Sequence, residues 1–430
     1  MKKGFYWIIS AQFLSSLADN SLLIVAIALL QEISAPAWAT PMLKFTFVVS
    51  YVLLAAFVAA FADSRPKGKV MFITNMIKIT GLLLMLFGSH PLLAYGVVGL
   101  GAAAYSPAKY GILTELLPPE KLVVANSWIE GTTVVSIILG MGLGGVLIKP
   151  EIAEVISHYM PGKTFAQSAL WVVLIFYATA AVCNLFIPDT GARYPKVNWR
   201  IGAMLKEFGY SVKTLWHDKL GQISLAVTTL FWGAGATLQF IVLEWAKESL
   251  GLPLSESSWL LAVFAIGITI GAVSAGALIP LKKSLKVLGL GILMGISCAA
   301  LSFYHKGLVG NMDVFGVPLY LIIACLCLIG IGALAGFFVV PMNALLQHRG
   351  HVRLTAGHSI AVQNFNENIG ILVMLGVYAV LIKLQLSTQA IMVIFGGFVA
   401  CTIGLVMLWH KINMRERDWT VLIGEEKQPH

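Results

Sequence analysis

The chain has 430 residues, of which 58% are hydrophobic and only 11% are charged. Soluble domains carry about 25% charged residues, so the composition excludes an ordinary soluble protein and predicts an all-α protein that crosses the membrane many times. The formal net charge is +9, but the basic residues are spread over many loops and do not form one patch. We therefore expect membrane lipids around the protein, and no nucleic acid as a partner.

Neither the first apolar segment nor the cysteines suggest a cleaved leader or a metal site. The segment runs over about residues 5–30, whereas a signal peptide has an apolar region of roughly 7–15 residues, so we expect a retained first helix. The five cysteines all lie in apolar segments and show neither a disulfide framework nor zinc spacing. We expect no metal and no cofactor.

Twelve apolar runs follow one another along the chain, each near the roughly 20 residues that a membrane span needs. They cover about residues 5–30, 43–62, 69–89, 91–113, 122–148, 165–187, 221–246, 258–281, 286–305, 317–343, 358–383 and 388–410. The longest non-apolar stretch divides them six and six. We predict an N-terminal six-helix bundle (1–188), a basic cytoplasmic connector (189–220), a C-terminal six-helix bundle (221–410) and a cytoplasmic tail (411–430).

The distribution of lysine and arginine predicts the orientation of these helices. With the N-terminus in the cytoplasm, the inside segments hold 21 basic residues and the outside segments hold 5. Short cytoplasmic loops carry such an excess of lysine and arginine. We therefore expect a multi-pass protein of the bacterial inner membrane with both termini in the cytoplasm.

The two halves of the chain also resemble each other. Residues 121–127 match residues 353–359 at an offset of 232, and residues 105–109 match residues 339–343 at an offset of 234. Both matches fall at the junction of the fourth and fifth helices of their half. Two parallel six-helix repeats joined by a basic loop are typical of the major facilitator architecture, whose substrate site lies near the midplane. We predict twelve helices in two pseudo-symmetric bundles.

Ionisable residues inside apolar runs are the first candidates for a substrate site. Asp19 and Asn20 lie near the middle of the first run and Lys109 lies in the fourth, and we predict that all three contact the substrate. An ionised carboxylate at the centre of a membrane helix costs roughly 2.5–3.5 kcal/mol, so such a group faces a partner or a wet cavity. An anion and a cation in different helices would suit a zwitterion. The alternatives are a structural hydrogen-bond cluster of Asp19 with Gln12 and Asn20, and snorkelling of Lys109 to the interface.

Three further groups of polar residues are candidates. Lys78 in the third helix could pair with a carboxylate, and Gln239 adds a polar group in the seventh. The eleventh helix carries a polar run. Gln363 and Glu367 share one face of this helix, and Asn364 and Asn368 share a second face. Because so many polar groups would be costly against lipid, we expect this run to line the cavity or pack against another helix.

The loop between the second and third helices resembles the major facilitator loop motif, an aspartate followed by basic residues around a glycine. Here the residues are Asp63, Arg65, Lys67 and Lys69, with Gly68 displaced by two positions. We predict that Asp63 holds basic groups of this loop and latches the cytoplasmic side. The alternative is an ordinary basic loop.

A glycine-rich run at 140–145 could be mistaken for a nucleotide-binding loop. It lies within a predicted span and follows no strand, so the context that a dinucleotide site requires is missing. Small residues in a membrane helix instead allow close packing against a neighbour.

Taken together, the segments 11–23, 101–113, 230–238, 336–347 and 360–368 resemble the bacterial lysophospholipid transporters, the LplT-type branch of the major facilitator superfamily. The resemblance covers nearly the whole chain, and the Tyr-Ser-Pro-Ala-Lys-Tyr-Gly block at 105–111 is its most specific part. It implies a flippase that moves lysophosphatidylethanolamine and related lysolipids from the outer to the inner leaflet, where an acyltransferase reacylates them. The family's first-helix acid and fourth-helix lysine correspond to Asp19 and Lys109.

One departure from the family pattern and two other functions stay open. Gln239 stands where the family has an arginine, so either Gln239 or Lys78 could take the phosphate contact. A transporter of small water-soluble zwitterionic or amphipathic solutes would have the same composition. A membrane-embedded acyltransferase would need a general base, commonly histidine, and none lies beside Asp19 in the sequence. We therefore expect a transporter and not an enzyme.

Overall fold

The computed structural model describes residues 3–58, 61, 65–116, 119–160, 162, 164–191, 200–310, 312–314, 316–354 and 356–423. Within these ranges the chain is almost entirely helical. It divides into two compact units, the first formed by Met1–Arg200 and Leu254–Ala262 and the second by Ile201–Pro253 and Val263–His430. Each predicted apolar run overlaps a helix of the structure.

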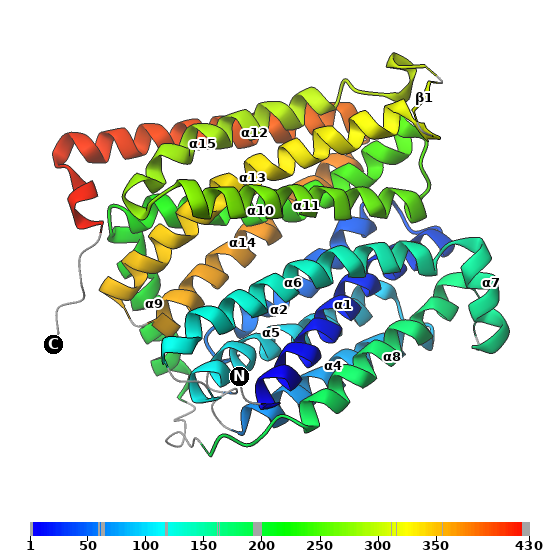
Figure 1. Ribbon diagram of the computed structural model, residues 1–430, viewed down its shortest axis with the longest axis horizontal. Helices are drawn as coiled ribbons and strands as arrows, with labels where there is room; N and C mark the ends of the chain where they lie inside the picture. Colours follow the sequence, from blue (N-terminus) through cyan, green and yellow to red (C-terminus); the bar gives the residue numbers. More distant parts are fainter. Residues whose placement is uncertain are drawn as a thin grey trace. The chain divides into compact units, whose positions relative to one another are not determined.

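The helices of the first unit pack around α1, which Figure 1 shows running between α6 and α8. Apolar residues of α1 such as Ile8, Leu22 and Ile24 are fully buried. The helices are α1 (Lys3–Glu32), α2 (Ala39–Leu54), α4 (Lys67–Leu86), α5 (Pro91–Leu116), α6 (Pro119–Leu147), α7 (Pro150–Tyr159) and α8 (Phe165–Leu185).

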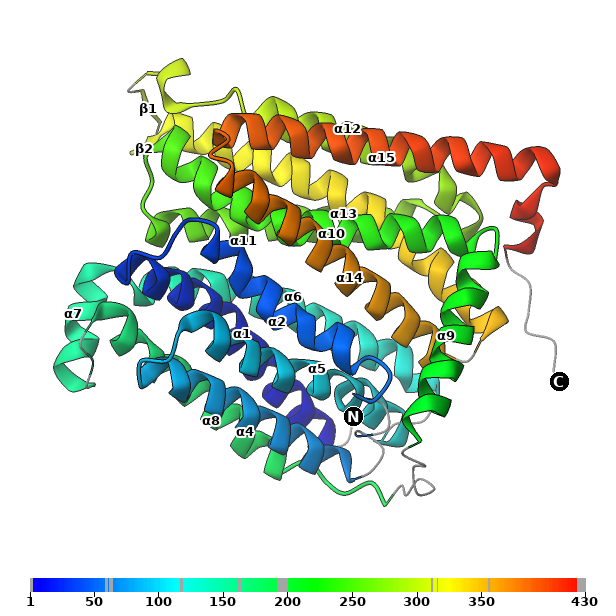
Figure 2. The same ribbon diagram turned by 180° about the vertical axis from the view of Figure 1, so that it is seen from behind.

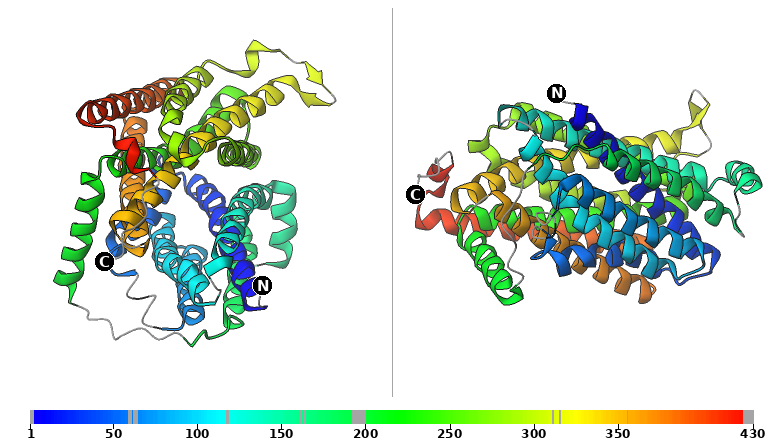
Figure 3. Two further views of the ribbon diagram at one scale, coloured as in Figure 1. Left: turned by 60° about the vertical axis from the view of Figure 1, so that its left-hand side comes forward. Right: turned by 90° about the horizontal axis from the view of Figure 1, so that it is seen from below.

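The second unit is built around α10 in the same way. Its elements are α9 (Ile201–His217), α10 (Gly221–Trp245), η1 (Ala246–Leu250), most of α11 (Leu254–Leu278), η2 (Leu281–Val287), α12 (Leu288–Leu301), η3 (Lys306–Leu308), β1 (Asp313–Val314), β2 (Val317–Pro318), α13 (Leu319–Arg353), α14 (Ala356–Lys383), α15 (Thr388–Glu416) and η4 (Trp419–Leu422). The antiparallel β1–β2 pair forms a small hairpin that projects beyond α12 and α13 (Figure 3, left).

The second unit repeats the neighbour pattern of the first. In the first unit α1 contacts α6 and α8, α5 contacts α2 and α4, and α4 contacts α8. In the second unit α10 contacts α14 and α15, and α12 contacts α13 and α15. Close backbone approaches at Gly267, Gly271 and Gly336 pack α11 against α13. The main helices of each unit therefore make equivalent contacts, which confirms the predicted pseudo-symmetry.

Nine helices in the described residues are long and apolar enough to cross a membrane, and ten if the bent pair of α6 and α7 forms one span. The helix α2 has 16 residues and falls below that length. The structure therefore supports the polytopic helical fold without confirming the predicted count of twelve. Two amphipathic helices, α7 and α9, were not predicted, since neither is an apolar run.

The glycine-rich run of α6 is a helix-packing surface. A Cβ at Gly140 would lie 2.7 Å from the carbonyl oxygen of Leu17, and one at Gly144 would lie 2.9 Å from that of Ser21. Ser21 Oγ also donates a hydrogen bond of 2.9 Å to the carbonyl of Gly140. Because Gly140 and Gly144 have no side chains, α1 can approach α6 closely, as the sequence suggested.

Candidate functional site

The first unit contains a buried ion pair between α1 and α4. Lys78 Nζ donates to Asp19 Oδ2 at 2.7 Å, and the Tyr177 hydroxyl of α8 donates to Asp19 Oδ1 at 2.6 Å. The Asp19 side chain keeps 19% of its surface exposed, whereas that of Lys78 keeps 2%. Short, charge-assisted bonds of this kind offset part of the cost of removing two charges from water.

Lys78 is held from several sides. Its ammonium also donates to Ser15 Oγ at 3.0 Å and lies 5.1 Å from the centre of the Tyr105 ring. Ser15 in turn donates to Asn75 Oδ1 at 2.8 Å. Gly101 makes room for the lysine, because a Cβ there would lie 2.7 Å from Lys78 Cγ. These contacts fix the cation beside the carboxylate.

Two polar atoms beside this pair have no hydrogen-bond partner in the part of the chain that the structure describes. The hydroxyl of Tyr105 and Nδ2 of Asn75 are buried without a hydrogen bond to the described residues. A buried hydrogen-bonding atom without a partner carries a desolvation cost of about 1–3 kcal/mol. Such atoms are suited to water or to a polar ligand group. The region of Asp19 and Lys78 therefore combines an anion, a cation and spare hydrogen-bonding capacity.

The polar neighbours of Asp19 in the sequence bond both within α1 and to α6. Asn20 Nδ2 donates to the carbonyl of Ser16 at 2.8 Å, within the same helix. Gln12 bonds to Thr133 and, at 3.4 Å, to Thr132, both on α6. Gln12 and Asp19 both bond to other helices, as a structural interhelical cluster would require. The substrate roles of Asp19 and Asn20 stay predictions, and that alternative stays open.

The cation that pairs with Asp19 is Lys78 on α4. Lys109 is half-buried on α5, in the turn after Pro107, the proline inside that helix. The sequence offered Lys78 as a possible partner of a carboxylate but favoured Lys109 for the substrate. The role of Lys109 in substrate binding stays a prediction.

The predicted cytoplasmic latch lies only partly within the described residues. Asp63 lies outside them. Arg65 and Lys69 are exposed, and Lys67 is buried in the first turn of α4. The latch therefore stays a prediction.

The polar run of α14 forms a buried cluster in the second unit. Gln363 Nε2 donates to Glu367 Oε1 at 2.8 Å and to Asn343 Oδ1 of α13 at 3.3 Å. Both Gln363 and Glu367 are buried, on the shared face that their spacing predicted. Asn364 is half-buried and its carbonyl accepts from Asn368 at 2.7 Å.

Gln239 on α10 is the position where the family resemblance led us to expect an arginine. Its side chain is half-buried, and its Nε2 is buried without a hydrogen-bond partner among the described residues. An uncharged donor therefore stands there without a protein acceptor. The substrate contact predicted for Gln239 stays a prediction.

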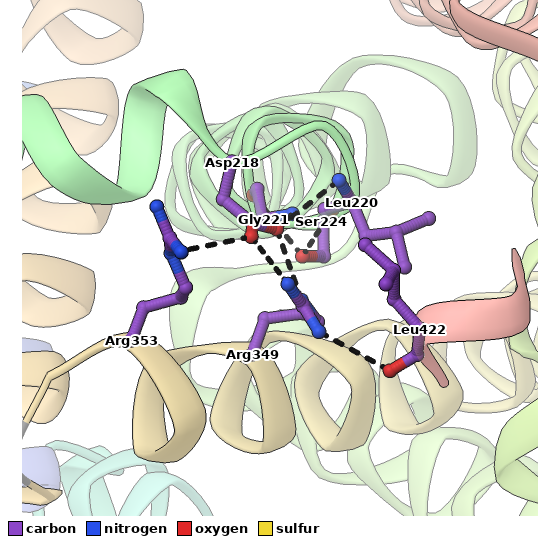
Figure 4. Close-up of polar contacts among 7 residues, drawn as sticks. All are labelled: Asp218, Leu220, Gly221, Ser224, Arg349, Arg353 and Leu422. Carbon is purple, nitrogen blue, oxygen red and sulfur yellow. Dashed lines mark hydrogen bonds and ion pairs between the residues drawn. The ribbon is translucent and has the colours of Figure 1, made fainter. Parts of the chain in front are cut away.

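A second buried ion pair, which the sequence did not indicate, ties α10 to the end of α13 (Figure 4). Arg349 donates from Nη2 to Asp218 Oδ2 at 2.6 Å and from Nε to Asp218 Oδ1 at 3.1 Å. The backbone amides of Leu220 and Gly221 also donate to Asp218 Oδ1. Arg349 Nη1 reaches the carbonyl of Leu422, so the pair holds the C-terminal segment as well.

The surroundings of Asp218 change its titration. Burial acts to raise its pKa, but the hydrogen bonds and positive charge of Arg349, together with the amides of Gly221 and Leu220, outweigh burial and lower that pKa below its ordinary value. Arg353 adds a looser ion pair at 3.7 Å. We name Asp218, Arg349 and Leu422 the α10–α13 clasp.

Among the described residues, no group of three or more histidine, cysteine, aspartate or glutamate side chains is arranged to hold a metal ion. Within the described helices, Asp19 is paired with Lys78, and Glu367 accepts a hydrogen bond from the Gln363 amide.

Comparisons with known proteins fit this geometry. The model of the Major Facilitator Superfamily matches residues 8–374. The lysophospholipid transporter LplT of Cronobacter sakazakii is 40% identical over 95% of this chain and 96% of its own length. That of Yersinia enterocolitica is 41% identical over 91% of this chain and 90% of its own length.

Solved structures show the same fold. The nucleoside transporter NupG superimposes with a TM-score of 0.67 at 13% identity, covering 95% of this chain and all of that one. The POT family transporter PepTSo gives 0.68 at 12% identity, covering 97% of this chain and 99% of that one. The chain therefore belongs to the major facilitator superfamily and, within it, to the family of the lysophospholipid transporter LplT.

Proposed function

We propose that this protein transports lysophospholipids, with lysophosphatidylethanolamine as a principal substrate, from the outer to the inner leaflet of the bacterial inner membrane. The observation that carries the proposal is the buried Asp19–Lys78 pair, in a chain about 40% identical to proteins named lysophospholipid transporter. Alternating access of the two halves moves the headgroup. An acyltransferase on the cytoplasmic side then reacylates the lysolipid.

The headgroup of lysophosphatidylethanolamine has the same two charges as the pair. Its phosphate replaces the Asp19 carboxylate as the partner of Lys78, and its ammonium takes Asp19. Exchanging partners keeps both buried charges compensated, which costs less than separating them without a substitute. The free Tyr105 hydroxyl and Asn75 Nδ2 can donate to phosphate oxygens, which are strong acceptors.

Further polar residues in both units are also assigned roles in binding or gating. Lys109 is the second candidate for the phosphate, and the polar residues of the second unit are proposed to contact substrate during the transport cycle. These are Gln239, Gln363, Asn364 and Glu367. Asn20, next to Asp19 on α1, is also proposed to contact the substrate. The loop of Asp63, Arg65, Lys67 and Lys69 is proposed to latch the cytoplasmic side.

A leaflet-specific uptake assay tests the function. Labelled lysophosphatidylethanolamine is added outside proteoliposomes, and albumin extraction removes what stays in the outer leaflet. In vesicles with the wild-type protein, we expect the labelled lysolipid to become resistant to albumin extraction faster than in empty vesicles. Vesicles with heat-inactivated protein should behave like empty ones. The deacylated headgroup, glycerophosphoethanolamine, should neither enter nor compete, because it lacks the acyl chain.

The same assay separates the two transporter classes. Rapid uptake of glycerophosphoethanolamine or of another small zwitterion, with no protection of the lysolipid, would contradict the proposal. That result would favour the water-soluble solute that composition alone left open.

A further inference from the structure

The helix α9 carries an apolar stripe that is only half covered by protein. Residues 201, 205, 208 and 212 fall on one side of a helix. Phe208 and Val212 pack against a buried cluster of Leu215, Leu225, Leu346 and Val362. Ile201 and Leu205, farther toward the N-terminus, are 60% and 49% exposed. The stripe therefore continues past the surface of the second unit.

The charge of α9 is suited to an anionic surface. Lys206 and Lys213 are exposed and lie on the same flank of the stripe, and Glu207 is the only acidic residue of the helix. The connector to which α9 belongs has six basic residues and is predicted to be cytoplasmic. An amphipathic helix with lysines beside its apolar face is typical of binding to anionic membrane surfaces.

The direction of α9 agrees with such a role. Figure 2 shows α9 crossing the ends of α10 and α14, whereas those two helices run through the unit. A helix across the ends of membrane spans lies near the plane of the bilayer surface.

One hydrogen bond joins α9 directly to the polar run of α14. Trp216 Nε1 donates to Asn366 Oδ1 at 3.0 Å. Asn366 is buried and immediately precedes Glu367. The Phe208 and Phe365 rings also meet edge to face with centres 5.1 Å apart. A displacement of α9 would therefore disturb these contacts with the part of α14 that carries Gln363 and Glu367.

We propose that α9 docks on anionic phospholipid headgroups of the cytoplasmic leaflet, and that the Trp216–Asn366 hydrogen bond transmits this docking to α14. Ile201 and Leu205 enter the interface, and Lys206 and Lys213 meet the headgroups. Anionic lipid thus becomes a regulatory ligand of the transporter. The inference concerns a helix of the second unit, whereas Asp19 and Lys78 belong to the first, and it does not depend on which substrate is carried.

The docking is tested with the full chain in two kinds of nanodisc, one of phosphatidylcholine and one that also contains phosphatidylglycerol. An environment-sensitive label is attached at Leu205→Cys and, as the control on the opposite face, at Tyr210→Cys. The signal of the unsubstituted protein, which has its own cysteines, is subtracted. We expect the Leu205 label to shift its emission to shorter wavelength and to be quenched by brominated lipid, more strongly with phosphatidylglycerol. The Tyr210 label should change little.

Charge reversal supplies the matched control. Lys206→Glu with Lys213→Glu should abolish the dependence on phosphatidylglycerol, whereas Lys282→Glu with Lys283→Glu should leave it intact. The control pair is also exposed and predicted to be cytoplasmic. The proposal would be overturned if the Leu205 label responded equally in both kinds of nanodisc. It would also be overturned if both charge-reversal variants lost the dependence on phosphatidylglycerol. Burial of the label only after addition of cytosolic protein would do the same, since it would indicate a protein partner.

The transmission is tested by hydrogen exchange of the peptide that contains residues 363–367. Wild type should be more protected in nanodiscs with phosphatidylglycerol than in phosphatidylcholine alone. Trp216→Phe removes the N–H and keeps an aromatic ring, so the label at Leu205→Cys should still respond while the difference in exchange disappears. A difference that survives in Trp216→Phe would overturn the role of this hydrogen bond.

Discussion

The Asp19–Lys78 pair determines what single substitutions in the first unit can do. Each charge has been removed from most of its water and is compensated by the other. Removing one partner of a buried pair leaves an uncompensated charge and is strongly destabilising, whereas replacing both with apolar or neutral groups is often tolerated. Function and folding can therefore be separated at this site by comparing single and double variants.

The stability of the first unit should show this non-additivity. Asp19→Asn and Lys78→Met should each destabilise the protein, by about 3–5 kcal/mol for a fully buried pair and less here because Asp19 is partly exposed. The double variant should recover most of the loss. Thermal unfolding in detergent measures the three variants, and additive losses would mean that the two side chains do not stabilise each other.

The phosphate contact should be identified by comparing two lysines. Lys78→Ala should weaken binding of lysophosphatidylethanolamine more than binding of a monoacylglycerol, which has no phosphate. Lys78→Arg should restore only part of the lysophosphatidylethanolamine binding that Lys78→Ala loses, since a planar guanidinium differs from a compact ammonium. Titration of both ligands against Lys78→Ala and Lys109→Ala is the measurement. A phosphate-dependent loss in Lys109→Ala alone would move the contact to α5.

At the scale of elements, small residues and the clasp decide how helices meet. Gly140 and Gly144 let α1 approach α6, and the α10–α13 clasp joins segments that are 131 residues apart in the sequence. The glycine contacts share α1 with Asp19, whereas the α10–α13 clasp lies in the second unit. Each can be tested by stability without measuring transport.

Gly140→Ala should destabilise the protein, although alanine favours helix more than glycine does. Its Cβ would lie 2.7 Å from a carbonyl oxygen of α1, and overpacking of this kind typically costs about 1–3 kcal/mol. Gly235→Ala on α10 is the matched control, because nothing lies within 4 Å of its Cβ. Thermal unfolding should rank the control at or above wild type and Gly140→Ala below it. Equal stability would contradict the close α1–α6 contact.

The clasp should lose its stabilising effect in acid. The pKa of Asp218 is lower in the folded protein than its ordinary value of about 3.9. Its contribution to folding is therefore fully present above pH of about 4 and is lost as pH falls through the lowered folded-state pKa. The difference in melting temperature between wild type and Asp218→Asn should be constant from neutral pH to about 5 and then shrink. A difference that grows in acid would contradict the lowered pKa.

The positions of the helices could be predicted from the sequence more easily than the contacts between them. A membrane-spanning helix can be predicted from its own segment, because a run of about 20 apolar residues is stable in the bilayer and not in water. The surface helices α7 and α9 are not such runs, and only tertiary packing shows what their faces meet. Asp19 could be recognised as a buried acid from its own segment, but its partner could not. Lys78 and Lys109 are both cations in apolar runs, and helix packing decided between them.

On the scale of the whole molecule, two units with similar helix contacts carry different polar groups. The first contains the ion pair of Asp19 and Lys78, and the second contains the Asp218–Arg349 ion pair and the amide and carboxyl cluster around Gln363 and Glu367. Weak sequence repeats indicated the shared architecture, and the equivalent helix contacts of the two units confirm it. The polar groups are not repeated, so the repeat gives the fold but leaves the chemistry to individual residues.

The most direct measurement is leaflet-specific lysophosphatidylethanolamine uptake by the double variant Asp19→Asn with Lys78→Met, normalised to folded protein in the proteoliposomes. This variant keeps a compensated interior but has neither headgroup partner. We expect its melting temperature to be near that of wild type and its uptake to be near that of empty vesicles. A double variant that folds and transports like wild type would contradict the claim that this pair binds the headgroup.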